Sequence, residues 1–344
     1  MSVDPLTVAS AQVPETEAQR ISAEHFDIPG KAFRLAGEKD QIFRIESERA
    51  GESYFLKIAH ESEPEAAYGL VTRALTHVAD ASPAVPVPRI VPDVNGAAQL
   101  AVSVLGGPLR WTRLTTYMPG QLLKTVVVTP VMRRNVGRAL AQLAVALESF
   151  NDPAAERRVG WDIAHAGDAY RMLDELDDIE DRDLLLRIFE HHMAVIGRRV
   201  AELRRQPVHN DLNTDNILVD PENDQVCGLI DFDDLTVSQV INDLAVAAAG
   251  HIADDSDPLT PALEVARGYH SISPLEPSEL ALLPALMTVR LAMYLVIGNW
   301  RARRFPENRQ YILRKAPLVR AQMRRLTDVP ASAAIEQAMQ VRNR

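Results

Sequence analysis

The sequence has few of the residues and patterns that mark several large classes of protein. Cysteine occurs once in 344 residues, at Cys227, which excludes an internal disulfide framework. No apolar run reaches transmembrane length, and the N-terminus lacks the pattern of a signal peptide. Basic residues are outnumbered, with 37 Lys and Arg against 47 Asp and Glu, and the net charge of −10 argues against general nucleic-acid binding. We therefore expect a cytoplasmic protein with no nucleic-acid or membrane partner, and the acidic balance favours a cationic substrate.

The sequence does contain enough apolar material for two lobes or domains. Hydrophobic residues make up 47% of the chain and charged residues 24%, which is ordinary for a globular protein. Alternation over residues 41–46, a glycine-containing turn at residues 50–52 and a second apolar run at residues 53–58 predict a β-hairpin. Thr129-Pro130 then predicts the start of a long amphipathic helix that reaches Phe150. Strands are therefore expected early in the chain and a long helix after them.

Polar residues with clear chemistry stand beside two short apolar strands in the middle of the chain. Asp211 and Asn216 precede the strand at residues 217–219, and Asp231 follows the strand at residues 227–230. Turn residues separate the strands, so they can pair as a hairpin that brings the three polar residues to one edge of a small sheet. One carboxylate there can accept a hydroxyl proton, while the amide oxygen and the second carboxylate suit Mg2+. These are the parts of a phosphoryl-transfer site.

These motifs resemble those of a known family. They are similar to the catalytic and metal motifs of the aminoglycoside phosphotransferase and choline kinase group, which shares the protein-kinase fold: His209, Asp211, Asn216 and Ile230-Asp231. The spacing from the first Asp to the Asn matches that group, whereas Asn210 and Asp233 replace the Arg and the Gly of the kinase motifs. The resemblance implies an α+β, protein-kinase-like bilobal fold with a small β-rich N-lobe and a larger, mainly helical C-lobe.

The resemblance also predicts a division of the chain into domains. Residues 1–25 are expected to form a loose arm with a short helix from Thr16 to His25, because they show little periodicity. Residues 26–118 would be the nucleotide-binding N-lobe, and residues 119–344 the catalytic and acceptor-binding C-lobe. ATP and Mg2+, the implied cofactors, would lie in the cleft between the lobes.

Several N-lobe residues are implied in nucleotide binding. Lys57, at the end of a strand, is similar to the lysine that contacts the ATP phosphates, although solvated strand-end lysines are common. Glu65 is the candidate acid that pairs with it, although an acid at a helix start also suits the helix dipole. A glycine-rich loop is missing, since Gly37 is the only glycine in its region. The strand that precedes Pro119 is similar to the hinge that binds adenine, which implies this set: Leu114, Thr115, Thr116, Tyr117 and Met118.

By the same resemblance, some C-lobe residues would carry out the reaction and others would hold the loop in place. Asp211 would orient the acceptor hydroxyl and take its proton, and Asn216 and Asp231 would hold Mg2+. His209 would order the loop, and Asp243 would brace it by accepting backbone N–H groups.

The acceptor is expected to be a small hydroxylated and cationic compound. The segment 37–41, Trp161-Asp162 and the run 231–234 resemble the hydroxylysine kinase-like subgroup. Trp161 and Asp162 would suit an ammonium group, or they are a packing Trp and a helix-capping Asp. Either Asp233 or Asp234 would assist the metal, contact an ammonium or cap a loop. The acidic run at residues 173–183 would hold a cationic substrate, or it is a solvated face.

Other functions remain open at this point. A kinase for an aminoglycoside, choline, ethanolamine or homoserine has the same motifs. A catalytically silent nucleotide-binding module would explain the missing glycine-rich loop, but the three polar residues at the metal edge are all present. A metal-dependent hydrolase is disfavoured because no other set of ligand residues is visible in the sequence.

Overall fold

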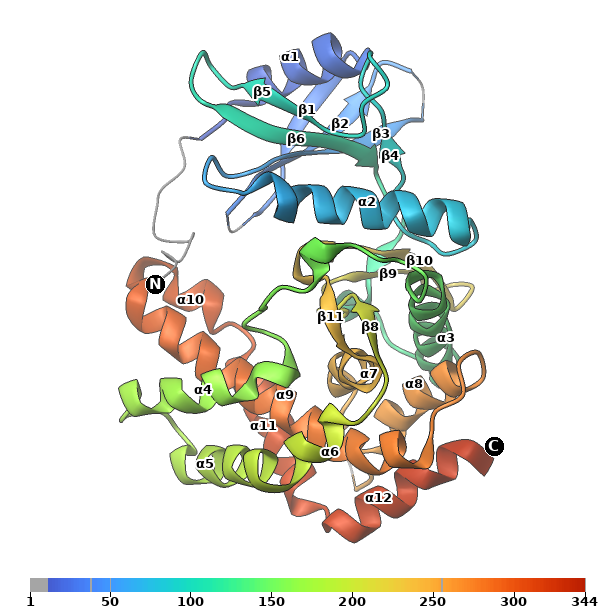
Figure 1. Ribbon diagram of the computed structural model, residues 1–344, viewed down its shortest axis with the longest axis vertical. Coiled ribbons are helices and arrows are strands. Elements are labelled where there is room, and N and C mark those ends of the chain that lie inside the picture. Colours follow the sequence, from blue (N-terminus) through green and yellow to red (C-terminus); the bar gives the residue numbers. More distant parts are fainter. Residues whose placement is uncertain (1–11, 38, 50, 255, 344) are drawn as a thin grey trace. The chain divides into compact units, whose positions relative to one another are not determined.

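The computed structural model describes residues 12–37, 39–49, 51–254 and 256–343 (Figure 1). Residues 1–11 of the expected arm, Glu38 of the segment 37–41 and Ala50 of the predicted turn lie outside the described residues. The chain divides into two compact units, Met1–Pro119 and Gly120–Arg344. This division falls one residue after the predicted boundary.

A six-stranded antiparallel sheet forms the centre of the N-terminal unit. Its order is β1-β2-β3-β6-β4, and β5 also pairs with β6. The strands are β1 (Gly30–Arg34), β2 (Gln41–Ser47), β3 (Ser53–Ile58), β4 (Ile90–Val91), β5 (Leu100–Ser103) and β6 (Leu109–Thr116). The predicted hairpin is confirmed as β2 and β3, with Ile42 opposite Lys57. Because side chains alternate along a strand, Phe43 and Ile45 of β2 both reach the core.

Two helices complete this unit, α1 (Glu15–Phe26) and α2 (Glu65–Ala81). Ala18, Ile21 and Phe26 of α1 belong to the same buried core as the sheet. The predicted short helix is therefore confirmed, but it packs on the sheet and is not part of a loose arm. The apolar residues lie on one helical face, and burial of that face against the sheet stabilises a helix whose other residues are charged or polar.

Two small antiparallel sheets frame the middle of the C-terminal unit. Their strands are β7 (Gln121–Leu122), β9 (Ile217–Asp220) and β10 (Gln225–Leu229) in the order β10-β9-β7, and β8 (Arg205–Val208) paired with β11 (Thr236–Gln239). The second predicted hairpin is confirmed, because Gln225 of β10 pairs with Asp220 of β9. The loop between β8 and β9 carries the first polar motif.

The rest of the C-terminal unit is helical. Its helices are α3 (Pro130–Leu147), α4 (Ala166–Met172), α5 (Arg182–His191), α6 (Gly197–Ala201), α7 (Val240–Ala249), α8 (Thr260–His270), α9 (Pro277–Arg304), α10 (Arg309–Ile312), α11 (Ala316–Asp328) and α12 (Ala331–Met339). Thr129 caps α3 as predicted, because its Oγ1 accepts the N–H of Met132 at 3.0 Å. Local hydrogen bonding therefore starts this helix at the predicted residue.

Helix α9 is the apolar centre of the C-terminal unit. An 18-residue window of this helix has a mean hydropathy of 2.0, so the expectation that no apolar run reaches transmembrane length is wrong. Of that window, 78% is buried inside the protein, and α7, α11 and α12 pack against the helix. Burial on all sides is what a core helix of this composition requires.

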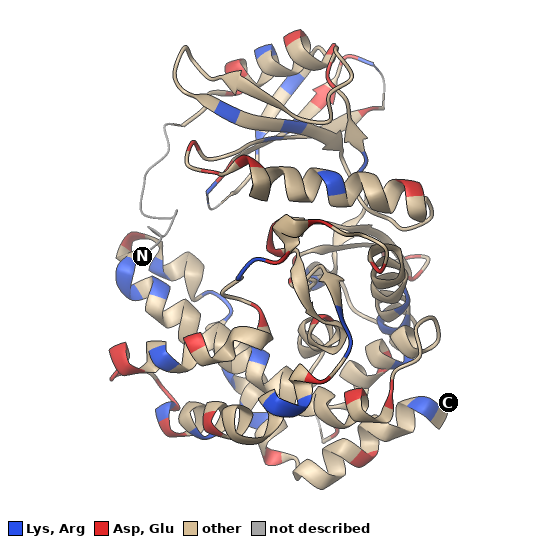
Figure 2. Cartoon of the chain, in the orientation of Figure 1, with Lys and Arg blue, Asp and Glu red and all other residues tan. Residues whose placement is uncertain are grey.

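The acidic run and the basic residues near the C-terminus pair with each other. The pairs are Arg304–Glu175, Arg320–Glu180 and Arg324–Asp181, with N···O distances of 2.9, 3.1 and 2.8 Å. Figure 2 shows acidic and basic segments side by side in this part of the unit. These exposed pairs contribute little stability, but they balance the charge of the acidic run. The structure therefore supports the solvated-face interpretation of the run.

Helices α3 and α8 approach so closely that glycine is required at the crossing. A Cβ atom on Gly137 would lie 1.9 Å from the carbonyl oxygen of Val265, and one on Gly268 would lie 1.9 Å from that of Arg134. Both neighbours are backbone atoms, so they cannot move aside as a flexible side chain would.

We predict that Gly268→Ala lowers the free energy of unfolding by about 1–3 kcal/mol, because the added methyl group forces α3 and α8 apart. Urea unfolding measures the change. Gly160→Ala is the matched control, because a Cβ atom at Gly160 meets nothing within 4 Å. Equal stability of the two variants would contradict the close approach of the helices.

Candidate active site

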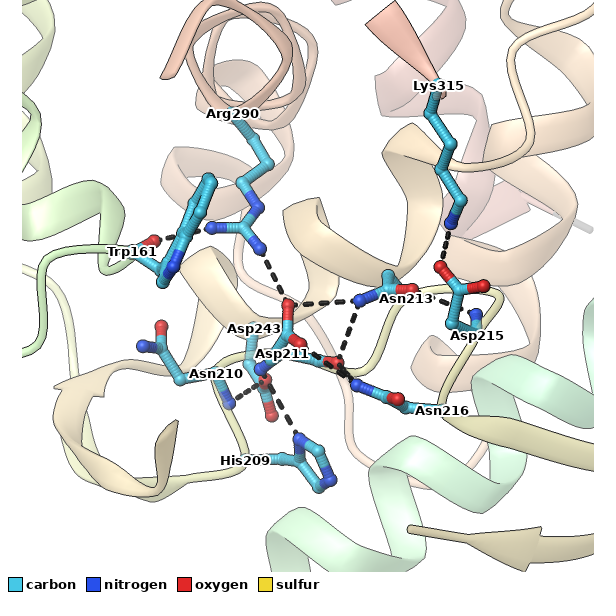
Figure 3. Close-up of polar contacts among 10 residues, drawn as sticks. All are labelled: Trp161, His209, Asn210, Asp211, Asn213, Asp215, Asn216, Asp243, Arg290 and Lys315. Atoms are coloured by element: carbon cyan, nitrogen blue, oxygen red, sulfur yellow. Dashed lines mark hydrogen bonds and ion pairs between the residues drawn. The ribbon is translucent and has the colours of Figure 1, made fainter. Parts of the chain in front are cut away.

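Asp243 of α7 accepts hydrogen bonds from the loop between β8 and β9 (Figure 3). Its Oδ1 accepts the backbone N–H of Asn210 at 2.7 Å, and its carboxylate also accepts the backbone N–H of His209. Asn210 has a φ of 68°, a left-handed conformation that is uncommon outside glycine. Burial raises the pKa of Asp243, which is 3% exposed, to about 7, and the two N–H donors oppose the rise. The predicted bracing contact is therefore present.

His209 links this loop to the second motif. The Nε2 atom lies 3.0 Å from the carbonyl oxygen of Ile230, and Nδ1 accepts the N–H of Asp211 at 3.3 Å. Burial lowers the pKa of His209 to about 4, so the ring is neutral and can donate from Nε2 while it accepts at Nδ1. Both contacts order the backbone on either side of the site.

The Asp211 carboxylate accepts hydrogen bonds from three side chains. Its Oδ1 accepts from Nη2 of Arg290 at 2.7 Å and from Nδ2 of Asn213 at 3.0 Å, and its Oδ2 accepts from Nδ2 of Asn216 at 2.9 Å. Burial raises the pKa of Asp211, and these three donors oppose the rise. The side chain keeps 23% of its surface exposed. An ionised carboxylate has about four lone-pair positions, so one position remains for a hydroxyl donor.

Asn216 and Asp231 stand where the β9–β10 hairpin begins and ends. The N–H of Ile230 donates to the carbonyl oxygen of Asn216 at 3.0 Å, which joins the two motifs. The Nδ2 of Asn216 faces Asp211, and its Oδ1 points away (Figure 3). Asp231 is exposed and has a φ of 67°, a strained conformation of the kind found at functional sites. The structure thus brings the three predicted residues to neighbouring positions.

These donors fit a weakly held magnesium ion better than a dedicated metal cage. The described residues contain no group of three or more His, Cys, Asp or Glu side chains placed to hold a metal ion. Mg2+ commonly takes one or two protein oxygens and fills its other positions with water and phosphate oxygens. An amide oxygen from Asn216 and a carboxylate from Asp231 match that pattern.

Asp234 is a further carboxylate near the site. Burial and the negative charges of Asp211 and Asp231 raise the pKa of Asp234 to about 7. Asp233, the other candidate, is exposed, and its backbone carbonyl accepts a hydrogen bond from Arg157. Of these two neighbours, Asp234 is therefore the more buried one, and the charges of Asp211 and Asp231 act on it.

Trp161 and Asp162 are adjacent in sequence but differ in environment. Asp162 is 2% exposed, and its Oδ1 accepts the N–H of Ala164 at 3.0 Å and the hydroxyl of Ser238 at 2.8 Å. Of the two alternatives left open by the sequence, the structure therefore supports the helix-capping Asp and not a substrate contact. Trp161 is half-buried, and its carbonyl oxygen accepts a hydrogen bond from Arg290, the residue that holds Asp211.

In the N-terminal unit, the carboxylate beside Lys57 belongs to Asp40. The Lys57 Nζ lies 2.9 Å from Oδ2 of Asp40, and the Lys57 side chain is 10% exposed. The other oxygen of Asp40 accepts the N–H of His60 at 2.8 Å. Glu65 is exposed at the first residue of α2, so the prediction that it pairs with Lys57 is wrong. The β2–β3 register explains why Asp40 lies beside Lys57. It places Gln41, the residue after Asp40, opposite Ile58, the residue after Lys57.

The predicted hinge residues lie at and after the end of β6. Leu114 and Thr115 are buried in the sheet. Thr116 and Tyr117 donate their N–H groups to carbonyl oxygens of the same unit at 2.9 and 3.0 Å. Met118 follows immediately. Adenine binding by these five residues stays a prediction.

Two residues of the site were not predicted from the sequence: Arg290 and Asp40. Arg290 did leave a signal, since it is a single charge inside an otherwise apolar helical pattern. Asp40 left none, because acids in loops are common. Asp215, which precedes Asn216, forms ion pairs with Lys124 and Lys315.

Comparisons with known proteins agree on family and fold. A family model described as a phosphotransferase enzyme family matches residues 32–283. The chain is 24% identical to hydroxylysine kinase of Mus musculus over 235 residues, which are 65% of this chain. The match spans 62% of that relative, less than two thirds of its length.

Two solved structures show the same fold. One is an amicoumacin kinase in complex with AMP-PNP, Ca2+ and Ami, with a TM-score of 0.65 and 17% identity over 83% of this chain and 85% of that one. The other is a microcompartment-associated aminopropanol kinase, with a TM-score of 0.63 and 19% identity over 95% of this chain and 97% of that one. The expected protein-kinase-like fold, with a β-rich N-terminal unit and a helical C-terminal unit, is confirmed.

We predict that acid destabilises the protein in part through His209. Its folded-state pKa of about 4 lies below the unfolded value of about 6.5, so the unfolded chain binds the proton first as the pH falls. The stabilisation is complete above about pH 6.5 and is lost as the pH falls toward about 4.

Urea unfolding of His209→Gln between pH 4 and 7 should show a shallower loss of stability with falling pH than the wild type. His191→Gln is the control, because His191 is exposed. If both variants lose stability as steeply as the wild type, His209 is not buried in its neutral form.

Proposed function

Because this chain belongs to the phosphotransferase enzyme family, we propose that it transfers a phosphoryl group from ATP to a hydroxyl group of a small amino-containing compound. A hydroxylysine-like amino acid is the favoured acceptor. One observation carries the proposal: three donors hold the Asp211 carboxylate and leave one lone-pair position open, beside the oxygen ligands of Asn216 and Asp231.

The reaction proposed for this site depends mainly on positioning. Asp211 orients the acceptor hydroxyl and accepts its proton at Oδ2. Phosphoryl transfer passes through a loose transition state, so alignment and charge neutralisation supply most of the acceleration. Asn216 and Asp231 would hold Mg2+, which neutralises phosphate charge when bound. Lys57 would contact the phosphates, with Asp40 as its partner in the N-terminal unit.

The choice of acceptor is supported by the names of similar proteins and by the acidic residues of the site. One relative is a hydroxylysine kinase and one solved structure is an aminopropanol kinase, so both act on compounds that carry an amino group and a hydroxyl group. Asp234, whose pKa is raised to about 7 by burial and by the charges of Asp211 and Asp231, would become ionised beside an acceptor ammonium. An aminoglycoside, choline, ethanolamine or homoserine is the alternative acceptor. A cytoplasmic location, where ATP is found, completes the proposal.

ADP release measured across a panel of hydroxylated amines tests the proposal. We expect turnover with hydroxylysine that exceeds turnover with homoserine, ethanolamine, choline and an aminoglycoside. Asp211→Asn should lower kcat by about 100-fold or more, because the base is lost while the shape of the side chain is kept.

Asp220→Asn is the matched control, since Asp220 lies at the far end of β9, and it should keep full activity. Binding of ATP with Mg2+ and no turnover on any acceptor would favour the silent nucleotide-binding module instead. Full activity in Asp211→Asn would remove the role given to that carboxylate.

A separate pair of variants tests the partner of Lys57. Asp40→Asn is expected to raise the KM for ATP by about tenfold, because a neutral side chain no longer holds the ammonium in place. Glu65→Gln should leave the KM for ATP unchanged, because Glu65 is exposed. The reverse order of effects, measured by steady-state kinetics, would restore Glu65 as the pairing acid.

A further inference from the structure

Arg290 is a charged residue in the most apolar helix of the protein. It lies in the middle of α9 with buried neighbours, Val289 and Leu291, and is itself 8% exposed. A buried guanidinium is strongly destabilising unless its N–H groups find acceptors. The position therefore needs an explanation beyond packing.

The guanidinium of Arg290 is held on two sides and over one face. Its Nη2 donates to Oδ1 of Asp211 at 2.7 Å, and its Nη1 donates to the carbonyl oxygen of Trp161 at 2.6 Å. Its Cζ atom lies 5.2 Å from the centroid of the Trp161 ring. Figure 3 shows the guanidinium between these two residues. The planar group is thereby fixed in both position and orientation.

This fixed donor makes the two oxygens of Asp211 unequal. Oδ1 accepts from both Arg290 and Asn213, which fills its two lone-pair positions. Oδ2 accepts from the Asn216 side chain and keeps one position open. An acceptor hydroxyl can then donate to Oδ2 only. This single hydrogen bond also sets the direction in which the lone pair of the hydroxyl oxygen points.

Lys315 is a second cation near Asp211, but its contacts differ from those of Arg290. It forms its ion pair with Asp215, and the chain also places Lys124 on that carboxylate. Lys315 therefore acts on Asp211 only through its charge. A lysine ammonium also lacks the two-sided fork with which Arg290 joins Asp211 to Trp161.

We propose that Arg290 is a positioning residue for the phosphoryl transfer: it locks Oδ1 of Asp211, so that the acceptor hydroxyl binds Oδ2 in a single orientation. Trp161 contributes by anchoring the guanidinium through its backbone carbonyl and its ring. This inference rests on the proposed function, and it assigns the specific role of a residue that the family motifs do not include.

Steady-state kinetics of Arg290→Ala and Arg290→Lys test the role. Arg290→Ala should lower kcat by roughly 100-fold, because a misplaced base costs about that much, while the KM for ATP stays within about twofold. Arg290→Lys should recover little of the loss, because the fork is missing. Low, non-denaturing concentrations of guanidinium should restore part of the activity of Arg290→Ala, which a purely structural role would not allow. Arg304→Ala is the matched control on the same helix, and it should keep wild-type kcat.

A double-mutant cycle with Asp211→Asn makes the test independent of small folding defects. If Arg290 acts through Asp211, replacing it in the Asp211→Asn background should change the residual kcat by no more than about twofold. Equal losses in both backgrounds would overturn the proposal, and so would a change confined to the KM for the acceptor. Thermal unfolding of each variant shows whether it is folded, and Arg290→Lys serves in the cycle if Arg290→Ala is not. Wild-type protein without ADP release on any acceptor would refute the proposed function itself, and this inference with it.

Discussion

The hydrogen bonds from the loop between β8 and β9 to Asp243 are the constraint on which the rest of the site depends. Asp243 accepts the N–H groups of His209 and Asn210, and it holds Asn210 in a left-handed conformation that would otherwise relax. The His209 ring in turn hydrogen-bonds to the carbonyl oxygen of Ile230, the residue before Asp231, and so orders the backbone there. One buried carboxylate thus sets the backbone from which Asp211 and Asp231 both project.

Each unit also contains an ion pair in which a residue proposed to act in the reaction contacts an opposite charge from another segment of the chain. Arg290 of α9 holds Asp211, and Asp40, which leads into β2, holds Lys57. Each pair is largely buried, so removing one partner would leave an uncompensated charge, which costs far more than an exposed pair would contribute. Helix α9 therefore serves both as the apolar centre of its unit and as the carrier of a guanidinium for the site.

Features with local causes were predicted well. The hairpins β2–β3 and β9–β10 follow from alternation and turn residues, and the start of α3 follows from its Thr-Pro cap. Predictions failed where the cause was distant. Helix α1 looks polar along its sequence, but Ile21 and its neighbours are buried by the sheet. For Asp162 the sequence left two alternatives open, and the contact with Ser238, 76 residues away, belongs to the buried cap.

By itself, the sequence determined the family of the chain and the polar residues to which the chemistry is proposed to belong. Asp211, Asn216 and Asp231 are placed by one loop and one hairpin, whose geometry depends on neighbours in the chain, so their type and spacing were informative. Only the tertiary structure decided how these residues are held. Arg290 meets Asp211 across 79 positions, and no periodicity or turn signal specifies which buried charge will lie opposite another after the helices pack.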